Sequence, residues 1–159
     1  MILIAYDGST DAEAAIDHAA DLFSGEPATV LCVWESFVDV MARTGGGLGF
    51  IDGGVNFEEI DSASQASAEE RAQEGASRAG RAGLKARPSV RVREATIAAA
   101  ILAEAAQVDA RAIVMGTRGL TGVKSLLLGS VSHAVLQHAD RPVVIVPSPE
   151  VAHQREQHR

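Results

Sequence analysis

Five short apolar runs recur along the chain, separated by longer stretches that mix apolar and polar residues. They cover residues 2–6, 29–34, 89–94, 112–116 and 143–146. The runs are rich in β-branched residues, and all but the third are apolar throughout, which is typical of strands covered on both faces. The run at 89–94 alternates instead, as in a strand nearer the edge of a sheet. Its two valines, Val90 and Val92, are expected to point inward and its two arginines outward.

Between these runs lie stretches with a helical pattern, at residues 10–23, 58–83, 97–107 and 130–139. Thr10 and Glu13 form a capping-box pattern at the start of the first stretch. Glu74 and Arg78 lie one turn apart in the second and are spaced to form an ion pair. Thr96 precedes the third stretch as a candidate cap. These features predict four helices.

The alternation of strands and helices predicts a mainly parallel sheet with right-handed crossovers. Residues 36–57 contain GGGLG and DGG and are interpreted as a long, mobile loop. The segment EVAHQREQHR at the end of the chain has no apolar pattern and is expected to be frayed. The pattern therefore predicts one α/β domain that ends soon after the fifth strand.

Composition narrows the classes of function. The length of 159 residues fits one domain, and a core with 4% aromatic residues must be built from Ala, Val, Ile and Leu. The net charge of −7 argues against a nucleic-acid partner and against a polybasic membrane-surface protein. No stretch approaches the ~20 apolar residues of a membrane span, and the apolar start is too short for a signal peptide. We expect a cytoplasmic protein.

Neither a catalytic nor a metal site is predicted. Cys32, the single cysteine, lies inside TVLCVW and is expected to be a small buried hydrophobe. His133 and His138 are five residues apart and would point to different faces of a helix. No G-x-S-x-G elbow is present. Glu35 and Asp39 are interpreted as a solvated loop edge rather than a carboxylate pair.

The stretch GTRGLTGVKSLLLGS, residues 116–130, joins the fourth apolar run to the last helical stretch. Ligands of open α/β sheets bind at the carboxyl ends of strands, and the start of a helix offers free N–H groups to an anion. Glycines there would let the backbone approach a ligand closely. A plain turn with a serine cap explains one glycine and one serine but not their spacing. The chain has neither a Gly-Lys dipeptide nor G-x-G-x-x-G, so the stretch is not a Walker loop or a dinucleotide fingerprint.

The pattern Gly-x2-Gly-x9-Gly-Ser, formed by Gly116, Gly119, Gly129 and Ser130, resembles the nucleotide-binding motif of ATP-binding members of the universal stress protein family. IAYDGS near the start and residues 116–147 are also similar to the family's opening and closing segments. The resemblance implies a Rossmann-like α/β domain over residues 1–147, followed by a polar tail, 148–159. It further implies a five-stranded parallel open sheet in the order 3-2-1-4-5, with helices on both faces.

Carried over by position, the resemblance implies an ATP site with three parts. The adenine pocket is lined by Ala5, Val33 and Met115, with Asp7 on the ribose or adenine side. A loop formed by Gly116, Thr117 and Gly119 wraps the ribose and phosphates. The phosphate cradle at the helix start consists of Gly129, Ser130, Val131 and Ser132. Mg²⁺ or Mn²⁺ is expected to bridge the phosphates, because no P-loop lysine neutralises them. For Asp7, capping of the turn DGST is the alternative role, and the two can coexist.

The resemblance also implies a homodimer formed by antiparallel pairing of the last strands, through Pro142, Val143, Val144, Ile145 and Val146. The expected function is that of an ATP-binding stress-response protein whose shape or partners depend on the nucleotide. One alternative is an enzyme, either a slow ATP hydrolase or a nucleotidyl transferase, although no base or nucleophile is evident. Another is an interaction module that prefers AMP or cyclic AMP.

Overall fold

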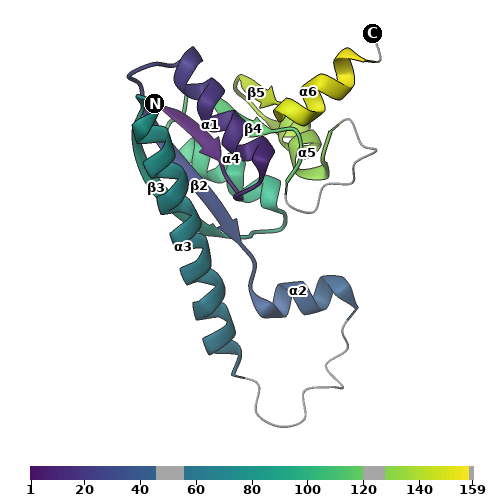
Figure 1. The fold of residues 1–159 in the computed structure, drawn as a ribbon. Coiled ribbons are helices and arrows are strands. Elements are labelled where there is room, and N and C mark those ends of the chain that lie inside the picture. The colour runs from purple at the N-terminus through teal and green to yellow at the C-terminus, as the bar shows by residue number, and fades with distance from the viewer. Residues whose placement is uncertain (46–55, 120–127, 158–159) are drawn as a thin grey trace.

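The computed structural model describes residues 1–45, 56–119 and 128–157 (Figure 1). Along the chain the elements are β1 (Ile2–Ala5), α1 (Thr10–Leu22), β2 (Pro27–Trp34), α2 (Phe37–Thr44), α3 (Phe57–Arg81), β3 (Lys85–Val92), α4 (Ile97–Gln107), β4 (Ile113–Gly116), α5 (Ser130–His138), β5 (Val143–Val146) and α6 (Pro149–Glu156). All five predicted strands and all four predicted helices are present. The structure adds two short helices, α2 and α6.

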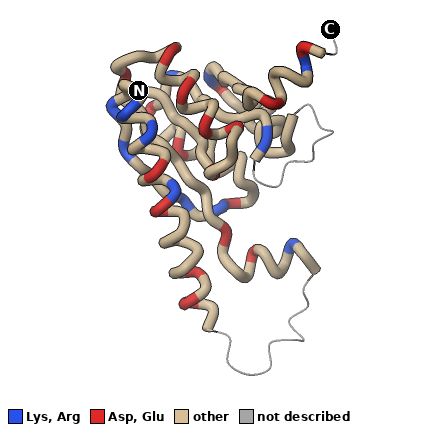
Figure 2. The backbone as a smooth tube through the Cα atoms, viewed as in Figure 1, with Lys and Arg blue, Asp and Glu red and all other residues tan. Residues whose placement is uncertain are grey.

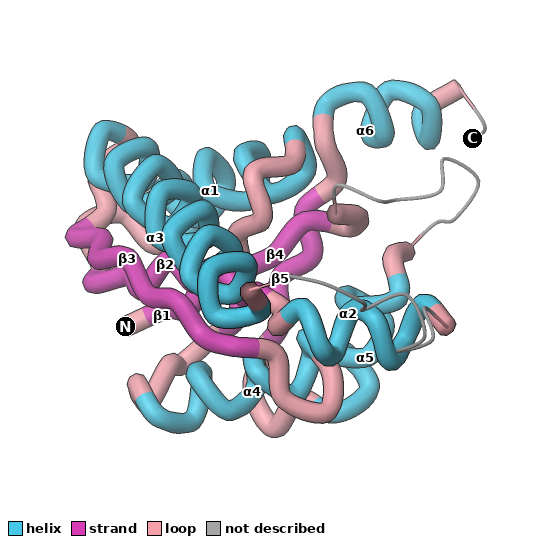
Figure 3. The backbone as a smooth tube through the Cα atoms, turned by 90° about the horizontal axis from the view of Figure 1, so that it is seen from below, coloured by secondary structure: helices cyan, strands magenta, loops and turns pink. Residues whose placement is uncertain are grey.

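The five strands form one parallel sheet in the order β3-β2-β1-β4-β5, which confirms the expected fold. β1 lies between β2 and β4. Its residue Ile4 pairs with Val30 of β2 on one side and with Val114 of β4 on the other. Helices α1 and α3 cover one face of the sheet, and α4 and α5 cover the other (Figure 3). The strand order therefore reverses between β1 and β4, and the loops that follow these two strands lie next to each other.

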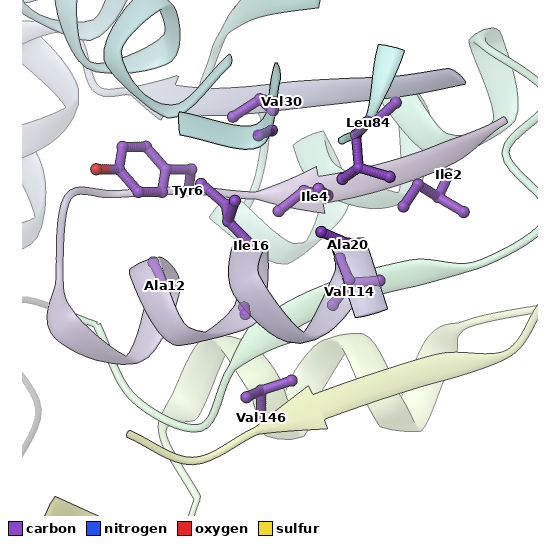
Figure 4. Packing of buried hydrophobic residues seen from close by; sticks show 14 of the residues in the cluster. Ile2, Ile4, Tyr6, Ala12, Ile16, Ala20, Val30, Leu84, Val114 and Val146 are labelled. Atoms are coloured by element: carbon purple, nitrogen blue, oxygen red, sulfur yellow. The ribbon is translucent and has the colours of Figure 1, made fainter. Parts of the chain in front are cut away.

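Small aliphatic residues build the core on both faces of the sheet. Between the sheet and helices α1 and α3, the side chains of Ile4, Ile16 and Val114 are completely buried (Figure 4). Gly75 of α3 lets the helix backbone approach the sheet, since a Cβ there would lie 2.8 Å from the ring of Tyr6. An alanine-rich core of this kind brings helix backbones close to the strands and leaves little room for larger side chains.

The side chain of Ser9, not that of Thr10, caps α1. Its Oγ accepts a hydrogen bond of 3.2 Å from the N–H of Ala12, so the capping box predicted from Thr10 and Glu13 is wrong. The helix therefore begins one residue earlier than that pattern assumed. By contrast, the predicted cap Thr96 is confirmed, because its Oγ1 accepts from Ala99 N at 3.0 Å.

Two elements carry charges of one sign only: α1 holds Asp and Glu but no Lys or Arg, and β3 holds Lys and Arg but no Asp or Glu, whereas α3 mixes both (Figure 2). Arg78 of α3 accordingly pairs across to α1, with Asp17 at 2.8 Å and Glu13 at 3.3 Å. The hydrogen bonds that Arg78 donates to the carboxylate of Asp17 raise the pKa of Arg78 above its usual value. The predicted partner of Arg78 within its own helix, Glu74, is therefore replaced by the carboxylates of the neighbouring helix.

β3 is an edge strand, as its alternating pattern predicted. Val90 packs against Ala68 and Ala72 of α3. Val92, however, is 42% exposed, so the prediction that it points into the core is wrong. Val92 is the last residue of this edge strand and does not belong to the cluster in which Val90 packs. On the opposite face, Arg91 is held by Glu104 of α4 at 3.4 Å rather than by solvent alone.

The two unpredicted helices are short and bury little. α2 lies within the predicted loop 36–57, begins after the capping residue Ser36 and has no buried residue. Residues 46–55 of that loop lie outside the described residues. α6 occupies most of the tail that was expected to be frayed; Ser148 caps it, and Val151 is buried. In the described part of the chain, no helix is long and apolar enough to cross a membrane.

Candidate functional site

A cavity of about 400 Å³ lies at the carboxyl ends of β1, β2 and β4. This is the point where the strand order reverses, and it is where open α/β sheets bind ligands. Of the residues predicted for the site, only Thr117 does not line the cavity. The predicted residues that do line it are Ala5, Asp7, Val33, Met115, Gly116, Gly119, Gly129, Ser130, Val131 and Ser132. The fold thus brings the first strand and the glycine-rich stretch together around one space.

Aliphatic side chains form a large part of the cavity lining. To the predicted Val33 and Met115 the structure adds Leu31 from β2 and two residues of α4, Ile97 and Ile101. Ile97 and Ile101 lie one turn apart on the first two turns of α4, so they project on the same side of that helix. Their helical spacing was visible in the sequence, but their proximity to the glycine-rich stretch depends on how α4 packs. An aliphatic lining of this kind suits a flat apolar group.

Asp7 serves the turn between β1 and α1 as well as the cavity wall. Its Oδ1 accepts a hydrogen bond of 3.0 Å from the N–H of Ser9, and Gly8 between them has a φ of +83°, in the left-handed region. A Cβ on Gly119 would collide with Oδ2 of Asp7, so this glycine lies directly against the carboxylate. The two roles expected for Asp7, in the turn and at the cavity, are therefore compatible in geometry.

The side chain of Thr117 turns away from the cavity. Thr117 is 2% exposed, and its hydroxyl donates to the carboxylate of Asp11 in the first turn of α1. The next backbone N–H, that of Arg118, donates to the same carboxylate at 3.2 Å. The family resemblance counted Thr117 among the ligand-facing residues, whereas its hydroxyl joins α1 to the end of β4.

α5 begins without a side-chain cap. Each of α1, α2, α3, α4 and α6 has a Ser, Thr or Asn side chain that accepts a hydrogen bond from its first turn. The cap position of α5 is Gly129, and no side chain of the described residues caps this helix. The N–H groups at the start of an α-helix carry partial positive charge and need acceptors. Those of α5 lie at the cavity wall formed by Ser130, Val131 and Ser132.

The two serines of this helix start differ in what their hydroxyls do. Ser132 is 3% exposed, and its Oγ donates to the carbonyl oxygens of Gly116 at 2.9 Å and Thr117 at 3.2 Å. Ser130 is exposed at the cavity wall. Both had been expected to offer hydroxyl donors to a ligand. In the structure, the hydroxyl hydrogen of Ser132 is committed to the protein.

Two of the glycines have a structural reason for lacking a side chain. A Cβ on Gly116 would lie 2.7 Å from the backbone carbonyl carbon of Asp11, and a Cβ on Gly129 would lie 3.1 Å from the carbonyl oxygen of Thr117. Close approach to a ligand was the expected reason for these glycines. Close approach of α1 already requires a glycine at 116, and a side chain at 129 would make a tight contact with the loop after β4.

Two arginines and one glutamate add charge to the cavity. Arg118 is 14% exposed in its side chain and lies 3.8 Å from the carboxylate of Asp11. Arg71 of α3, which the sequence did not single out, lines the cavity and donates to Ser67 of its own helix at 3.0 Å. Lys124, the other cation of the glycine-rich stretch, lies outside the described residues. Positive charge at the cavity therefore comes from α3 as well as from the expected loop.

Glu35, at the end of β2, lines the cavity but is not paired with Asp39. It forms ion pairs with Arg43 at 3.0 Å and Arg93 at 3.4 Å. Asp39 instead accepts a hydrogen bond of 2.8 Å from the hydroxyl of Ser36 at the start of α2. The two carboxylates therefore do not form a pair with each other, as expected, but Glu35 is held by two arginines and lines the cavity rather than lying at a solvated edge.

Burial shifts two ionisable groups near the sheet away from their charged forms. It raises the pKa of the Tyr6 phenol, and the carboxylates of Glu74 and Glu13 raise it further. Burial also raises the pKa of the Cys32 thiol, which is 1% exposed and therefore stays neutral, as expected of a small buried hydrophobe. Among the residues that the structure describes, no group of three or more His, Cys, Asp or Glu could hold a metal ion.

Comparison with known proteins agrees with this architecture. Residues 1–147 match the model of the universal stress protein family. A universal stress protein of Thermus aquaticus, from the 3′ region of the QAH/OAS sulfhydrylase, is 35% identical over 147 residues, which is 91% of this chain and 96% of the relative.

Two solved structures share the fold over most of the chain. A universal stress protein from Archaeoglobus fulgidus superposes with a TM-score of 0.62 at 27% identity, covering 91% of this chain and 96% of that one. The universal stress protein UspA from Lactobacillus plantarum gives 0.66 at 19% identity, with 91% and 95% covered. With its strand order, its cavity at the sheet's switch point and this match over residues 1–147, the chain belongs to the universal stress protein family.

Proposed function

We propose that this protein is a cytoplasmic ATP-binding stress-response protein, in which nucleotide occupancy sets the conformation or the choice of partner. The observation that carries the proposal is the start of α5, which has no side-chain cap among the described residues and lies at a cavity that is also lined by aliphatic side chains. A helix start of this kind favours an anion, and an apolar slot favours a purine ring. One ligand with both features is an adenine nucleotide.

The parts of the cavity suggest an orientation for ATP. The adenine would lie against Val33, Met115 and Ile97, with the ribose near Asp7. The phosphates would lie at Gly129 and Ser130, where backbone N–H groups and one exposed hydroxyl can donate. Mg²⁺ or Mn²⁺ would be held mainly by the phosphates and water, a common arrangement for Mg²⁺ at nucleotides. Arg71 supplies further positive charge near this end of the sheet.

Two related structures support an adenine nucleotide and leave the number of phosphates open. A universal stress protein of Archaeoglobus fulgidus was solved in complex with dAMP, and its chain is 24% identical to this one with a TM-score of 0.59. Another universal stress protein, 20% identical with a TM-score of 0.53, was solved with cAMP. An interaction module that prefers AMP or cyclic AMP is therefore the alternative to an ATP-dependent protein.

We favour binding over catalysis. The carboxylates that line the cavity are Asp7 and Glu35. Asp7 accepts a hydrogen bond from Ser9 N, and Glu35 is paired with two arginines. A general base needs a carboxylate that is available to the reacting group. Slow ATP hydrolysis or nucleotidyl transfer would have to use one of these two groups after its present partners had been displaced.

We further propose that two copies pair through β5, using residues 142–146. β5 is one edge of the described sheet, and its four residues are aliphatic. An apolar edge strand presents unpaired N–H and C=O groups to another chain. The other edge, β3, is less suitable because Pro88 lacks an N–H and Lys85 and Arg87 are exposed charges.

The central experiment is calorimetric titration of the purified protein with ATP, ADP, AMP and cyclic AMP, each with Mg²⁺. A Val33→Phe variant should lower ATP affinity by about tenfold or more, because the larger side chain would fill the aliphatic part of the cavity, and each factor of ten corresponds to about 1.4 kcal/mol.

Val92→Phe is the matched control, since it makes the same change on the neighbouring strand at an exposed position outside the cavity lining. It should leave affinity unchanged. If the wild-type protein takes up none of the four nucleotides, the proposed function is wrong. Preference for AMP or cyclic AMP would select the alternative.

A further inference from the structure

Asp11 is a buried carboxylate that contacts the loop after β4 but does not line the cavity. It lies in the first turn of α1 and is 5% exposed. Ser9 already caps this helix, so Asp11 is not needed as its cap. Its Oδ2 accepts from the hydroxyl of Thr117 and from the N–H of Arg118 at 3.2 Å, with Nε of Arg118 at 3.8 Å. A carboxylate at this depth is stable only when such partners surround it.

The backbone of Thr117 is tied to the start of α5 from the other side. Its carbonyl oxygen accepts from the N–H of Gly129 at 2.7 Å and from the hydroxyl of Ser132 at 3.2 Å. The same hydroxyl reaches the carbonyl of Gly116 at 2.9 Å. Thr117 is therefore bound to α1 through its side chain and to α5 through its carbonyl.

Packing leaves these three segments little freedom to shift. The backbone of Asp11 lies where a Cβ of Gly116 would be, and Thr117 O lies 3.1 Å from the position of a Cβ on Gly129. Among the described residues, no buried side-chain nitrogen or oxygen lacks a hydrogen-bond partner, so this network is complete. Complete buried networks fix one geometry, because breaking any member leaves a polar group without a partner.

We infer that Asp11 and Thr117 are positioning residues of the nucleotide site. They hold the two halves of the glycine motif, the loop at Gly116 and Gly119 and the helix start at Gly129, in one fixed arrangement. This inference rests on the proposed function. Backbone donors that are already in place bind an anion without the cost of being ordered, which is the physical advantage of preorganisation. The network should therefore matter for the phosphates of the ligand and not for its adenine ring.

The test is a double-mutant cycle on ligand affinity with Asp11→Ala, Thr117→Val and the double variant, titrated with Mg·ATP and with adenosine. Each single variant should bind ATP about tenfold more weakly, since one hydrogen bond to a charged group is worth about that factor, and adenosine within about twofold of wild type. The double variant should lose no more ATP affinity than the single variant that binds ATP less tightly, because the two side chains act through each other. Thr117→Ser keeps the hydroxyl and should retain wild-type affinity for ATP.

A stability control separates positioning from general weakening of the fold. Ile2→Val removes a methyl group from a completely buried residue at the start of β1, the end of that strand away from the cavity. It should lower the melting temperature and leave ATP affinity unchanged. If Asp11→Ala fails to fold, Thr117→Val and Thr117→Ser still test the inference.

The outcomes distinguish the two claims. Equal losses for ATP and adenosine, additive losses in the cycle, or wild-type ATP affinity in both single variants would overturn the positioning role and leave the proposed function standing. Absence of ATP binding by the wild-type protein would overturn both. Loss of ATP affinity in Thr117→Ser would also overturn the inference, since the hydroxyl would then not be the group that matters.

Discussion

Gly75 lies where α3 crosses the sheet, and its missing side chain leaves room for Tyr6 and Val30. A Cβ at this position would lie 2.8 Å from Cδ1 of Tyr6 and 2.9 Å from Cγ1 of Val30. Gly75→Ala should therefore lower the free energy of unfolding by about 1–3 kcal/mol, as overpacking of a core does. This loss should outweigh the ~1 kcal/mol that alanine gains over glycine in helix propensity. Urea unfolding measures the difference.

Gly80 provides the control in the same helix. A Cβ there meets nothing within 4 Å, so Gly80→Ala should raise the free energy of unfolding by up to about 1 kcal/mol. If the free energy of unfolding falls in Gly75→Ala and rises in Gly80→Ala, packing against Tyr6, rather than helix propensity, determines the effect of the substitution at Gly75. Stabilisation by both would contradict that explanation.

At the scale of single residues, the candidate site was predictable where backbone position mattered and unpredictable where side-chain direction mattered. The spacing of the glycines correctly gathered Gly116, Gly119 and Gly129 around one cavity. The direction of the Thr117 hydroxyl depends on how closely α1 approaches β4, a distance that no local pattern contains. Arg71 was missed for the same reason, since only the packing of α3 brings it to the cavity.

At the scale of elements, α5 offers a test in which stability and binding should move in opposite directions. Ser130 is the first residue of this helix and is exposed at the cavity. Ser130→Asp should stabilise the protein by about 0.3–1 kcal/mol, because a carboxylate interacts favourably with the positive end of a helix. It should weaken ATP binding by about tenfold or more, because the carboxylate repels the phosphates at short range. Thermal unfolding and calorimetry measure the two effects.

Ser62→Asp is the matched control for this change of charge. Ser62 is exposed on α3 and lies outside the lining of the cavity, so the variant should leave ATP affinity unchanged. If Ser130→Asp binds ATP as tightly as wild type does, the phosphates do not lie at the start of α5, and that part of the proposed orientation is wrong.

The elements themselves were predictable in proportion to what they bury. Helices pack against β1 and β5, and the apolar runs predicted the bounds of these two strands to within one residue. β3 begins at Lys85, several residues before its apolar alternation, because pairing with β2 extends the strand beyond the pattern. α2 buries no residue and α6 buries only Val151, so neither leaves a clear apolar period. The order of the strands came from the family resemblance, since strand adjacency is a long-range property.

At the scale of the whole molecule, the two edges of the sheet differ in what they offer another chain. Along β5, the N–H groups of Ile113 and Thr117 donate to the carbonyls of Pro142 at 2.9 Å and Val146 at 3.0 Å. Successive residues of a strand direct their backbone groups to alternate sides. The N–H and C=O groups of Val143 and Ile145 therefore point away from β4, toward the open edge. These are the groups that would pair in the proposed homodimer.

Ile145→Pro removes one outward N–H without touching the hydrogen bonds to β4, and it should convert the proposed dimer into a monomer in light scattering at micromolar concentration. Ile145→Ala is the control, because it loses the same packing against the α4 and α5 face but keeps the N–H. It should remain a dimer. If both variants dissociate, side-chain packing rather than strand pairing holds the two copies together. A wild-type protein that is monomeric under these conditions would show that the aliphatic edge of β5 is not a dimer interface.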